Sequence, residues 1–342
     1  MMVVKASSWR RALTATSLAI GLSLSWLTTA AAQSISGVVT SFGLPAYRRY
    51  FEEYSEETGV KVNYAVRSSA GSIERFIDES VDFIASDAPP TGAERERMSR
   101  GLLLLSTVGN GVAVIYNLRE APPDILISRE TLVKIFTGKI GNWNQVSPRL
   151  PNRKIQVVVH GEGSGTNFIF TRHLSALTKG KIEATKNPEW GFNVFASRDG
   201  DAAVASAVAL NDGAIGYVEA NYALSRNLST ARLQNKKGEY VRPTVDESHK
   251  ALLTTEWDEN FTLLKIDDPD EGYPIIGTSM LIFYQKYPNA EIAQAIKDFV
   301  SWVTSRGPEI NTELFYVALS PSERPGCGIT SITISRLVPR TL

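Results

Sequence analysis

The chain has 342 residues, and its 36 lysines and arginines balance 36 aspartates and glutamates, so the formal net charge at pH 7 is zero. Without a basic excess, the composition disfavours binding to nucleic acid or to anionic lipid. One cysteine, Cys327, excludes an internal disulfide, and three scattered histidines disfavour a structural or catalytic zinc site. Stability must therefore come from packing of a sizeable apolar core.

The N-terminus has the pattern of a secretory signal peptide. It opens with the basic residues Lys5, Arg10 and Arg11, continues with an uncharged, mostly apolar stretch over residues 12–29, and ends in small residues. A permanent membrane anchor is the alternative, but the stretch is near the lower length limit for spanning a bilayer and the alanine-rich end favours cleavage. We expect residues 1–32 to be removed and the mature protein to be soluble, slightly acidic and periplasmic.

Apolar runs typical of strands then alternate with amphipathic runs typical of helices. Strands are predicted at residues 34–41, 61–68, 81–87, 102–109, 112–118, 155–160, 214–219 and 275–285. Helices are predicted at residues 44–59, 72–80, 94–100, 128–138, 167–177, 201–210 and 291–307, with Ser128 as an N-cap and Gly59 as a terminator. This order indicates an α/β protein with mainly parallel sheets.

No proline- or glycine-rich linker divides the chain into two domains. Two lobes remain compatible with the sequence if the chain crosses between them more than once. Gly109–Gly111, between two predicted strands, is one candidate crossing, and the stretch containing Gly272 and Pro274 is another.

Four short segments place hydroxyls, glycine or aspartate where a predicted strand ends and a helix begins. They are residues 40–43, 68–71, 86–89 and 163–166. Ligands of open α/β sheets bind at the carboxyl ends of strands, and a helix N-terminus offers unpaired N–H groups and partial positive charge to an anion. Each segment alone is an ordinary N-cap, but four together indicate a shared oxyanion site without a metal.

The glycine-rich stretch VVVHGEGSGTNF at residues 157–168 matches no nucleotide or hydrolase motif in its spacing. Its third glycine is one residue early for a dinucleotide fingerprint, and Glu162 stands where a hydrolase nucleophile elbow needs glycine. A triad of His160, Ser164 and Asp87 is conceivable, but nothing in the sequence brings them together. His160 is equally compatible with a backbone hydrogen bond at a strand end or with a neutral donor facing the anion. His173 and His249 are interpreted as surface residues of helices.

The chain resembles the periplasmic phosphate-binding proteins that feed ABC uptake systems. The likeness is carried by SFGLPAYRRYFEEYSEETGVKVNYAVRSSAGS, VDFIASDAPPT, FTGKIGNWNQ, GEGSGTNFIFTRHLS and NDGAIGYVEANYA, and extends to IIGTSMLIFYQ and the helix after it. It implies a two-lobed type II periplasmic-binding-protein fold whose lobes close on the ligand by hinge bending. The implied division is a signal peptide at 1–32, lobe I at 33–111, lobe II at 112–274, and a return to lobe I with a C-terminal tail at 275–342.

The resemblance also implies a set of phosphate ligands. They are Ser41, the backbone N–H of Phe42, Ser69, Asp87, and the helix-opening residues Ser164, Gly165 and Thr166. Asp87 implies selectivity, because an ionised carboxylate only accepts hydrogen bonds, and phosphate has a proton to donate whereas sulfate has none. One position departs from the family: relatives carry arginine where this chain has His160, and Arg67 or Arg198 could supply the missing charge.

These observations predict a binding protein that captures inorganic phosphate and delivers it to an ABC permease, with no enzymatic step, cofactor or metal, and as a monomer. A secreted phosphatase or phosphoesterase with the same cradle, and a phosphate or oxyanion sensor or adhesin without a transport role, are the alternatives.

Overall fold

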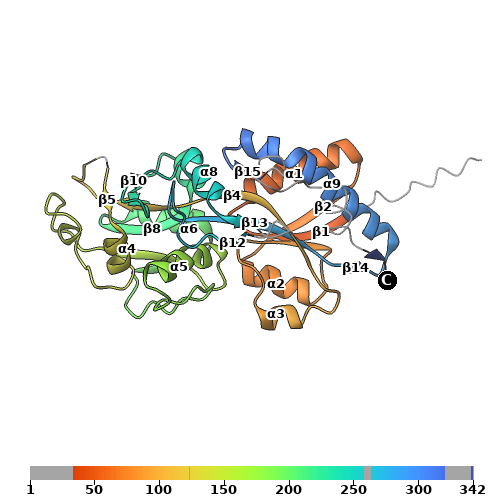
Figure 1. The fold of residues 1–342 in the computed structure, drawn as a ribbon, viewed down its shortest axis with the longest axis horizontal. Helices are drawn as coiled ribbons and strands as arrows, with labels where there is room; N and C mark the ends of the chain where they lie inside the picture. Colours follow the sequence, from red (N-terminus) through yellow and green to blue (C-terminus); the bar gives the residue numbers. More distant parts are fainter. Residues whose placement is uncertain (1–33, 123, 258–262, 320–339, 342) are drawn as a thin grey trace, which may run out of the picture. The chain divides into compact units, whose positions relative to one another are not determined.

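The computed structural model describes residues 34–122, 124–257, 263–319 and 340–341 (Figure 1). The predicted signal peptide at 1–32 and Cys327 lie outside the described residues. No helix within the described parts of the chain is both long and apolar enough to cross a bilayer.

One mixed sheet runs through the described chain. Its strands are β1 (Ser34–Val39), β2 (Lys61–Val66), β3 (Phe83–Ser86), β4 (Leu103–Asn117), β6 (Gln156–His160), β7 (Ala196–Arg198), β8 (Ala214–Glu219), β13 (Ile276–Phe283) and β15 (Val317–Ala318). They follow the order β2-β1-β3-β13-β4-β8-β6-β7, with β15 also paired to β4. The prediction of parallel pairing holds for β2-β1-β3 and for β8-β6-β7, whereas β4 and β13 in the middle pair antiparallel with their neighbours.

Short strands form three small additional sheets. One contains β5 (Leu126–Ile127), β9 (Arg232–Gln234) and β10 (Tyr240–Val241). The other two are the pairs β11 (Glu256–Trp257) with β12 (Leu263–Lys265) and β14 (Lys286–Tyr287) with β16 (Arg340–Thr341). These pieces of two or three residues carry too little pattern to be predicted from the sequence.

All seven predicted helices are present, and the described residues also form three that were not predicted. In chain order the helices are α1 (Leu44–Thr58), α2 (Ser69–Ile77), α3 (Gly92–Glu96), α4 (Arg129–Ile135), η1 (Trp143–Gln145), α5 (Gly165–Leu177), α6 (Gly200–Leu210), α7 (Ala220–Ser225), α8 (Val245–Leu253) and α9 (Ala290–Glu313). The three that were not predicted are η1, α7 and α8. Gly59 ends α1 in the left-handed conformation and Ser128 caps α4, which confirms both predictions. The predicted end of the last helix at Gly307 is wrong, because α9 continues through Pro308.

The two strands predicted at residues 102–109 and 112–118 are a single strand, β4. The prediction of a break failed because glycines usually weaken strands, but here they allow close packing. A Cβ on Gly109 would lie 2.9 Å from a methyl carbon of Leu252, and one on Gly111 would lie 3.0 Å from the ring of Tyr273. β13 pairs with β4 from Leu103 to Gly111, so two long strands run side by side through this part of the chain.

The buried side chains form two large clusters and one smaller cluster. The first cluster draws on residues 35–108 and 280–316, and the second draws mainly on residues 112–276. The described residues from Ser34 onward nevertheless belong to one compact unit. Along β4 the membership changes between Val108 and Val112, and along β13 between Ile276 and Met280. Both long strands therefore pass from one core to the other. The smaller third cluster lies between α6 and the sheet, around Val158, Val204 and Val218.

Candidate anion-binding site

A cavity of about 400 Å³ opens where five chain segments meet. Each segment follows the carboxyl end of a strand of the main sheet: β1, β2, β3, β6 or β7. This is the edge at which open α/β sheets bind ligands. The lining residues are Thr40, Ser41, Val66, Arg67, Ser68, Ser69, Asp87, His160, Gly161, Glu162, Ser164, Gly165, Thr166, Asp199 and Gly200.

Three helix N-termini converge on this cavity. Helices α2, α5 and α6 begin at Ser69, Gly165 and Gly200, and all three residues line it. Ser68 and Ser164 cap α2 and α5 by accepting hydrogen bonds from backbone N–H groups three residues on, at 3.2 and 3.3 Å. Each helix start leaves further N–H groups without an intrahelical partner, together with a partial positive charge of about +0.5. The arrangement therefore suits a small anion.

Asp87 is a buried carboxylate on the wall of the cavity. Its Oδ1 accepts hydrogen bonds from Thr40 Oγ1 and Ser279 Oγ, both at 2.6 Å, and its backbone N–H donates to Ser69 Oγ at 3.1 Å. The pKa of Asp87 is raised to about 7. Burial is the main cause, the hydrogen bonds from Ser279 and Thr40 act to lower the pKa, and the nearby charge of Asp201 acts to raise it. The site thus contains a proton acceptor that titrates near neutral pH.

His160 lines the cavity, and its ring nitrogen Nε2 contacts two other residues. Its Nε2 lies 3.0 Å from the carbonyl oxygen of Tyr217 and 3.7 Å from Oδ1 of Asp201. Because a carbonyl only accepts, Nε2 carries the hydrogen and donates it. Burial lowers the pKa of His160, and Asp201 opposes this only in part, so the ring is neutral near pH 7. The conceivable triad is not formed, since Ser164 Oγ caps α5 and the Nε2 of His160 faces Tyr217.

The two arginines considered as cation donors differ in position. Arg67 lines the cavity and is exposed, with one guanidinium N–H donated to the carbonyl of Val66 at 3.0 Å. Arg198 is also exposed, but it donates to the carbonyl of Ser197 and does not line the cavity. Arg67 is therefore the arginine placed to face an anion.

The burial of Phe42 leaves only its backbone to a ligand, whereas His173 lies differently from the position expected for it. The Phe42 side chain is fully buried in the second cluster and does not line the cavity, while its carbonyl accepts a hydrogen bond from Tyr316. Only its backbone N–H could serve a ligand, which stays a prediction. The interpretation of His173 as a surface residue is wrong, because it is buried and its Nδ1 lies 3.0 Å from the carbonyl of Asp267. Among the described residues, no three His, Cys, Asp or Glu side chains are grouped as metal ligands would be.

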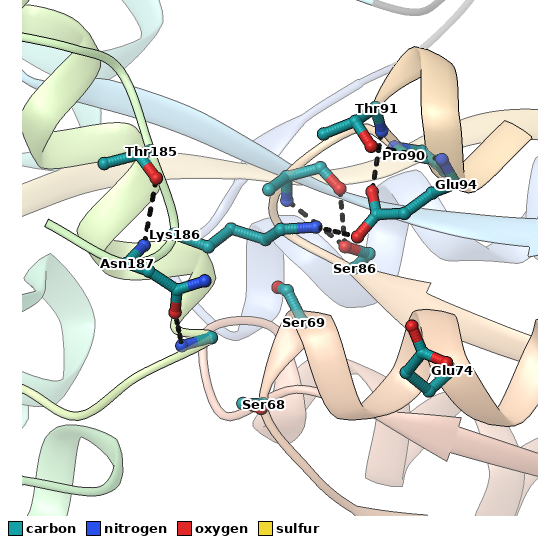
Figure 2. A network of polar contacts seen from close by, with 12 residues as sticks. Ser68, Ser69, Glu74, Ser86, Pro90, Thr91, Glu94, Thr185, Lys186 and Asn187 are labelled. Atoms are coloured by element: carbon teal, nitrogen blue, oxygen red, sulfur yellow. Dashed lines mark hydrogen bonds and ion pairs between the residues drawn. The ribbon is translucent and has the colours of Figure 1, made fainter.

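Contacts join the two walls of the cavity, one formed by the segments after β1, β2 and β3 and the other by the segments after β6 and β7 (Figure 2). The backbone N–H of Ala70 donates to the carbonyl of Gly163 at 3.0 Å, and the N–H of Gly163 donates to the side chain of Asn187 at 2.6 Å. Next to Asn187, the Lys186 ammonium reaches across to the Glu94 carboxylate at 2.6 Å. No local sequence pattern indicates this ion pair, because its partners lie 92 positions apart in the chain.

The fold and the cavity define the class of protein. Residues 27–306 match the PBP superfamily domain. Among solved structures, the fold is similar to a high-affinity periplasmic phosphate-binding protein bound with phosphate (19% identity, 91% of this chain and 100% of that chain, TM-score 0.71). It is also similar to a phosphate-binding protein from Stenotrophomonas maltophilia (19% identity, 91% and 100%, TM-score 0.68). These likenesses confirm the type II periplasmic-binding-protein fold.

Sequence similarity identifies the family. The chain is 33% identical over 312 residues to the phosphate-binding protein PstS of Haemophilus influenzae, covering 87% of this chain and 92% of the relative. It is 34% identical over 316 residues to PstS of Pasteurella multocida, covering 88% and 90%. The chain therefore belongs to the PstS family of phosphate-binding proteins.

Proposed function

We propose that the protein binds inorganic phosphate in the cavity and acts as a binding protein rather than an enzyme. The observation that carries the proposal is the convergence of three helix N-termini on a cavity that also contains the buried acceptor Asp87. The N–H groups and hydroxyls would bind the phosphate oxygens. Ser41, Ser69, Ser164, Gly165 and Thr166, which line the cavity, are the proposed ligands together with Asp87, the N–H of Phe42 and neutral His160.

Asp87 is proposed to distinguish phosphate from sulfate. An ionised carboxylate can only accept a hydrogen bond, and phosphate near neutral pH has a proton to donate. Sulfate has none and would place two negatively charged acceptors against each other in a buried site. A hydrogen bond to a charged group is worth about 1.5–3 kcal/mol, or roughly tenfold to a hundredfold in affinity.

Isothermal titration of ligand-stripped protein with phosphate and with sulfate tests this proposal. We expect tight binding of phosphate and little binding of sulfate at pH 8, where Asp87 is ionised. Asp87→Asn should weaken phosphate binding by roughly tenfold to a hundredfold and reduce the discrimination, since an amide can donate to sulfate. The same substitution at exposed Asp246 is the control. Absence of heat with millimolar phosphate would refute the function, and unchanged discrimination in Asp87→Asn would refute the role of the carboxylate.

We also propose that the two hydrophobic clusters correspond to two lobes, with lobe I at residues 33–111 and 275–342 and lobe II at residues 112–274, closing by hinge bending. Family membership and the N-terminal pattern further support a periplasmic location and delivery to an ABC permease. Phosphate uptake by cells that lack the gene, with and without a plasmid copy, tests delivery. Uptake that does not depend on the protein would favour a sensing role instead.

A further inference from the structure

The carboxylate of Asp87 is held asymmetrically by two buried hydroxyls. Thr40 Oγ1 and Ser279 Oγ both lie 2.6 Å from the same oxygen, Oδ1, and the two hydroxyls are 3.5 Å from each other. Thr40 follows β1 and Ser279 lies on β13, so the pair comes from segments 239 residues apart. Both residues are buried, at 2% and 0% exposure. Since an ionised carboxylate only accepts, both hydroxyls donate to Oδ1.

The other oxygen, Oδ2, points toward the start of helix α5. A Cβ added at Gly165 would lie 2.8 Å from Oδ2 of Asp87. Gly165 and Asp87 both line the cavity. Within the described chain, the side-chain hydrogen bonds to this carboxylate all go to Oδ1. Oδ2 is therefore the oxygen left to a ligand.

We propose that Thr40 and Ser279 are positioning residues that make Asp87 the proton acceptor for phosphate, by occupying Oδ1 and leaving an ionised Oδ2 to the ligand. The inference rests on the proposed function, and it adds two residues to those that distinguish phosphate from sulfate. Ser279 does not line the cavity, so it acts only through Asp87, whereas Thr40 lines the cavity as well.

Electrostatics shows why such a pair is needed. Burial alone favours the protonated form of Asp87, and a protonated carboxyl would donate a hydrogen bond rather than accept one. Donation from Ser279 and Thr40 lowers the pKa of Asp87 against this effect of burial. Other titratable or charged groups surround the carboxyl. Arg67, His160, Glu162 and Asp199 line the same cavity. Tyr47 and Asp201 interact with Asp87 electrostatically.

The test compares phosphate and sulfate affinity of the full chain between pH 5.5 and 8.5. The variants are Ser279→Ala, Thr40→Val, which is close to Thr40 in shape, and Thr40→Ser, which restores the hydroxyl. Ser106→Ala is the matched control, because Ser106 is a buried serine on the strand paired with β13 and its hydroxyl has no hydrogen-bond partner among the described residues.

In the wild type we expect the preference for phosphate to decline as pH falls and Asp87 becomes protonated. In Ser279→Ala and Thr40→Val, the loss of one hydrogen bond to a charge should move the midpoint of this decline upward by about one pH unit. This shift lowers the ionised fraction of Asp87 at pH 7.5 from about three quarters to about one quarter, so the preference at that pH should fall roughly threefold. Thr40→Ser and Ser106→Ala should behave as the wild type. Circular dichroism melting of each variant confirms that it is folded.

Two results would separate failure of the inference from failure of the function. If the wild type binds no phosphate, the proposed function fails. If the wild type discriminates but Ser279→Ala keeps the same ratio and midpoint, the positioning role is refuted. A variant that loses affinity for both anions equally would also refute it, because that result shows a merely structural role.

Discussion

Gly165 is the position at which one added methyl group should perturb the site most directly. It is the first residue of α5, and a Cβ there would lie 2.3 Å from Ser69 Oγ and 2.6 Å from the Cβ of Asp87. Non-bonded carbons prefer separations of about 3.5–4.0 Å, so α5 and the opposite wall must move apart by roughly 1 Å. Overpacking of this kind costs about 1–3 kcal/mol. Gly165→Ala should therefore weaken phosphate binding by roughly 5–150-fold.

The effect should appear in binding rather than in folding. Alanine has a higher helix propensity than glycine, and the backbone of Gly165 is not in the left-handed region, so α5 itself tolerates the change. Titration calorimetry should show the loss of affinity, and melting should show a smaller rise of the unfolding temperature with phosphate than in the wild type. Gly92→Ala is a matched control, because Gly92 also opens a helix after a hydroxyl N-cap but has open space around it. Wild-type affinity in Gly165→Ala would refute the reasoning.

Three further predictions concern charge. Lys186→Met should lower stability by about 1–2 kcal/mol. Burial acts to raise the pKa of Glu94, but its hydrogen bonds to Lys186 and Thr91 outweigh burial and lower the pKa below 4.5. The stability difference between the variant and the wild type, measured by urea unfolding, should therefore be present above pH 4.5 and vanish as pH falls. Arg67→Ala should weaken phosphate binding about twofold to fivefold and reduce the salt dependence of binding. Arg198→Ala is the control and should leave binding unchanged. Equal effects of the two substitutions would contradict the placement of Arg67 beside the anion. NMR titration should place the pKa of His160 below 6.5. The stability that the neutral ring contributes is then present at pH 7 and is lost as pH falls through that lower pKa. A pKa above 6.5 would contradict the neutral ring.

The sequence predicted most of the longer elements and much of the cavity lining, because both depend on local patterns. Alternating strands and helices located the loops, and hydroxyls with glycine at strand ends identified the segments around Ser69, Asp87 and Ser164. The departure at His160 was visible too, but its hydrogen bond to the carbonyl of Tyr217 was only one of several alternatives. A histidine at a strand end has no local signal for the direction of its ring.

The residues that were missed act through contacts between distant parts of the chain. Ser279 lies in an apolar strand, and only the register of β13 against β3 brings it to Asp87. The Lys186–Glu94 ion pair joins residues 92 positions apart. β4 was divided in error because glycine normally signals a turn, whereas here Gly109 and Gly111 make room for Leu252 and Tyr273. Such contacts follow from packing, which a single sequence does not reveal.

On the proposed function, the charge arrangement explains how selectivity is possible without a buried cation. A permanent cation beside the ligand would attract phosphate and sulfate alike, since both carry negative charge. Here the one arginine on the cavity wall is exposed and screened by solvent, and His160 is neutral near pH 7. Attraction then comes mainly from three helix N-termini and hydroxyl groups, which are fixed before the ligand arrives. Because this attraction is moderate, the single carboxylate of Asp87 is sufficient to reject an anion that cannot donate a proton.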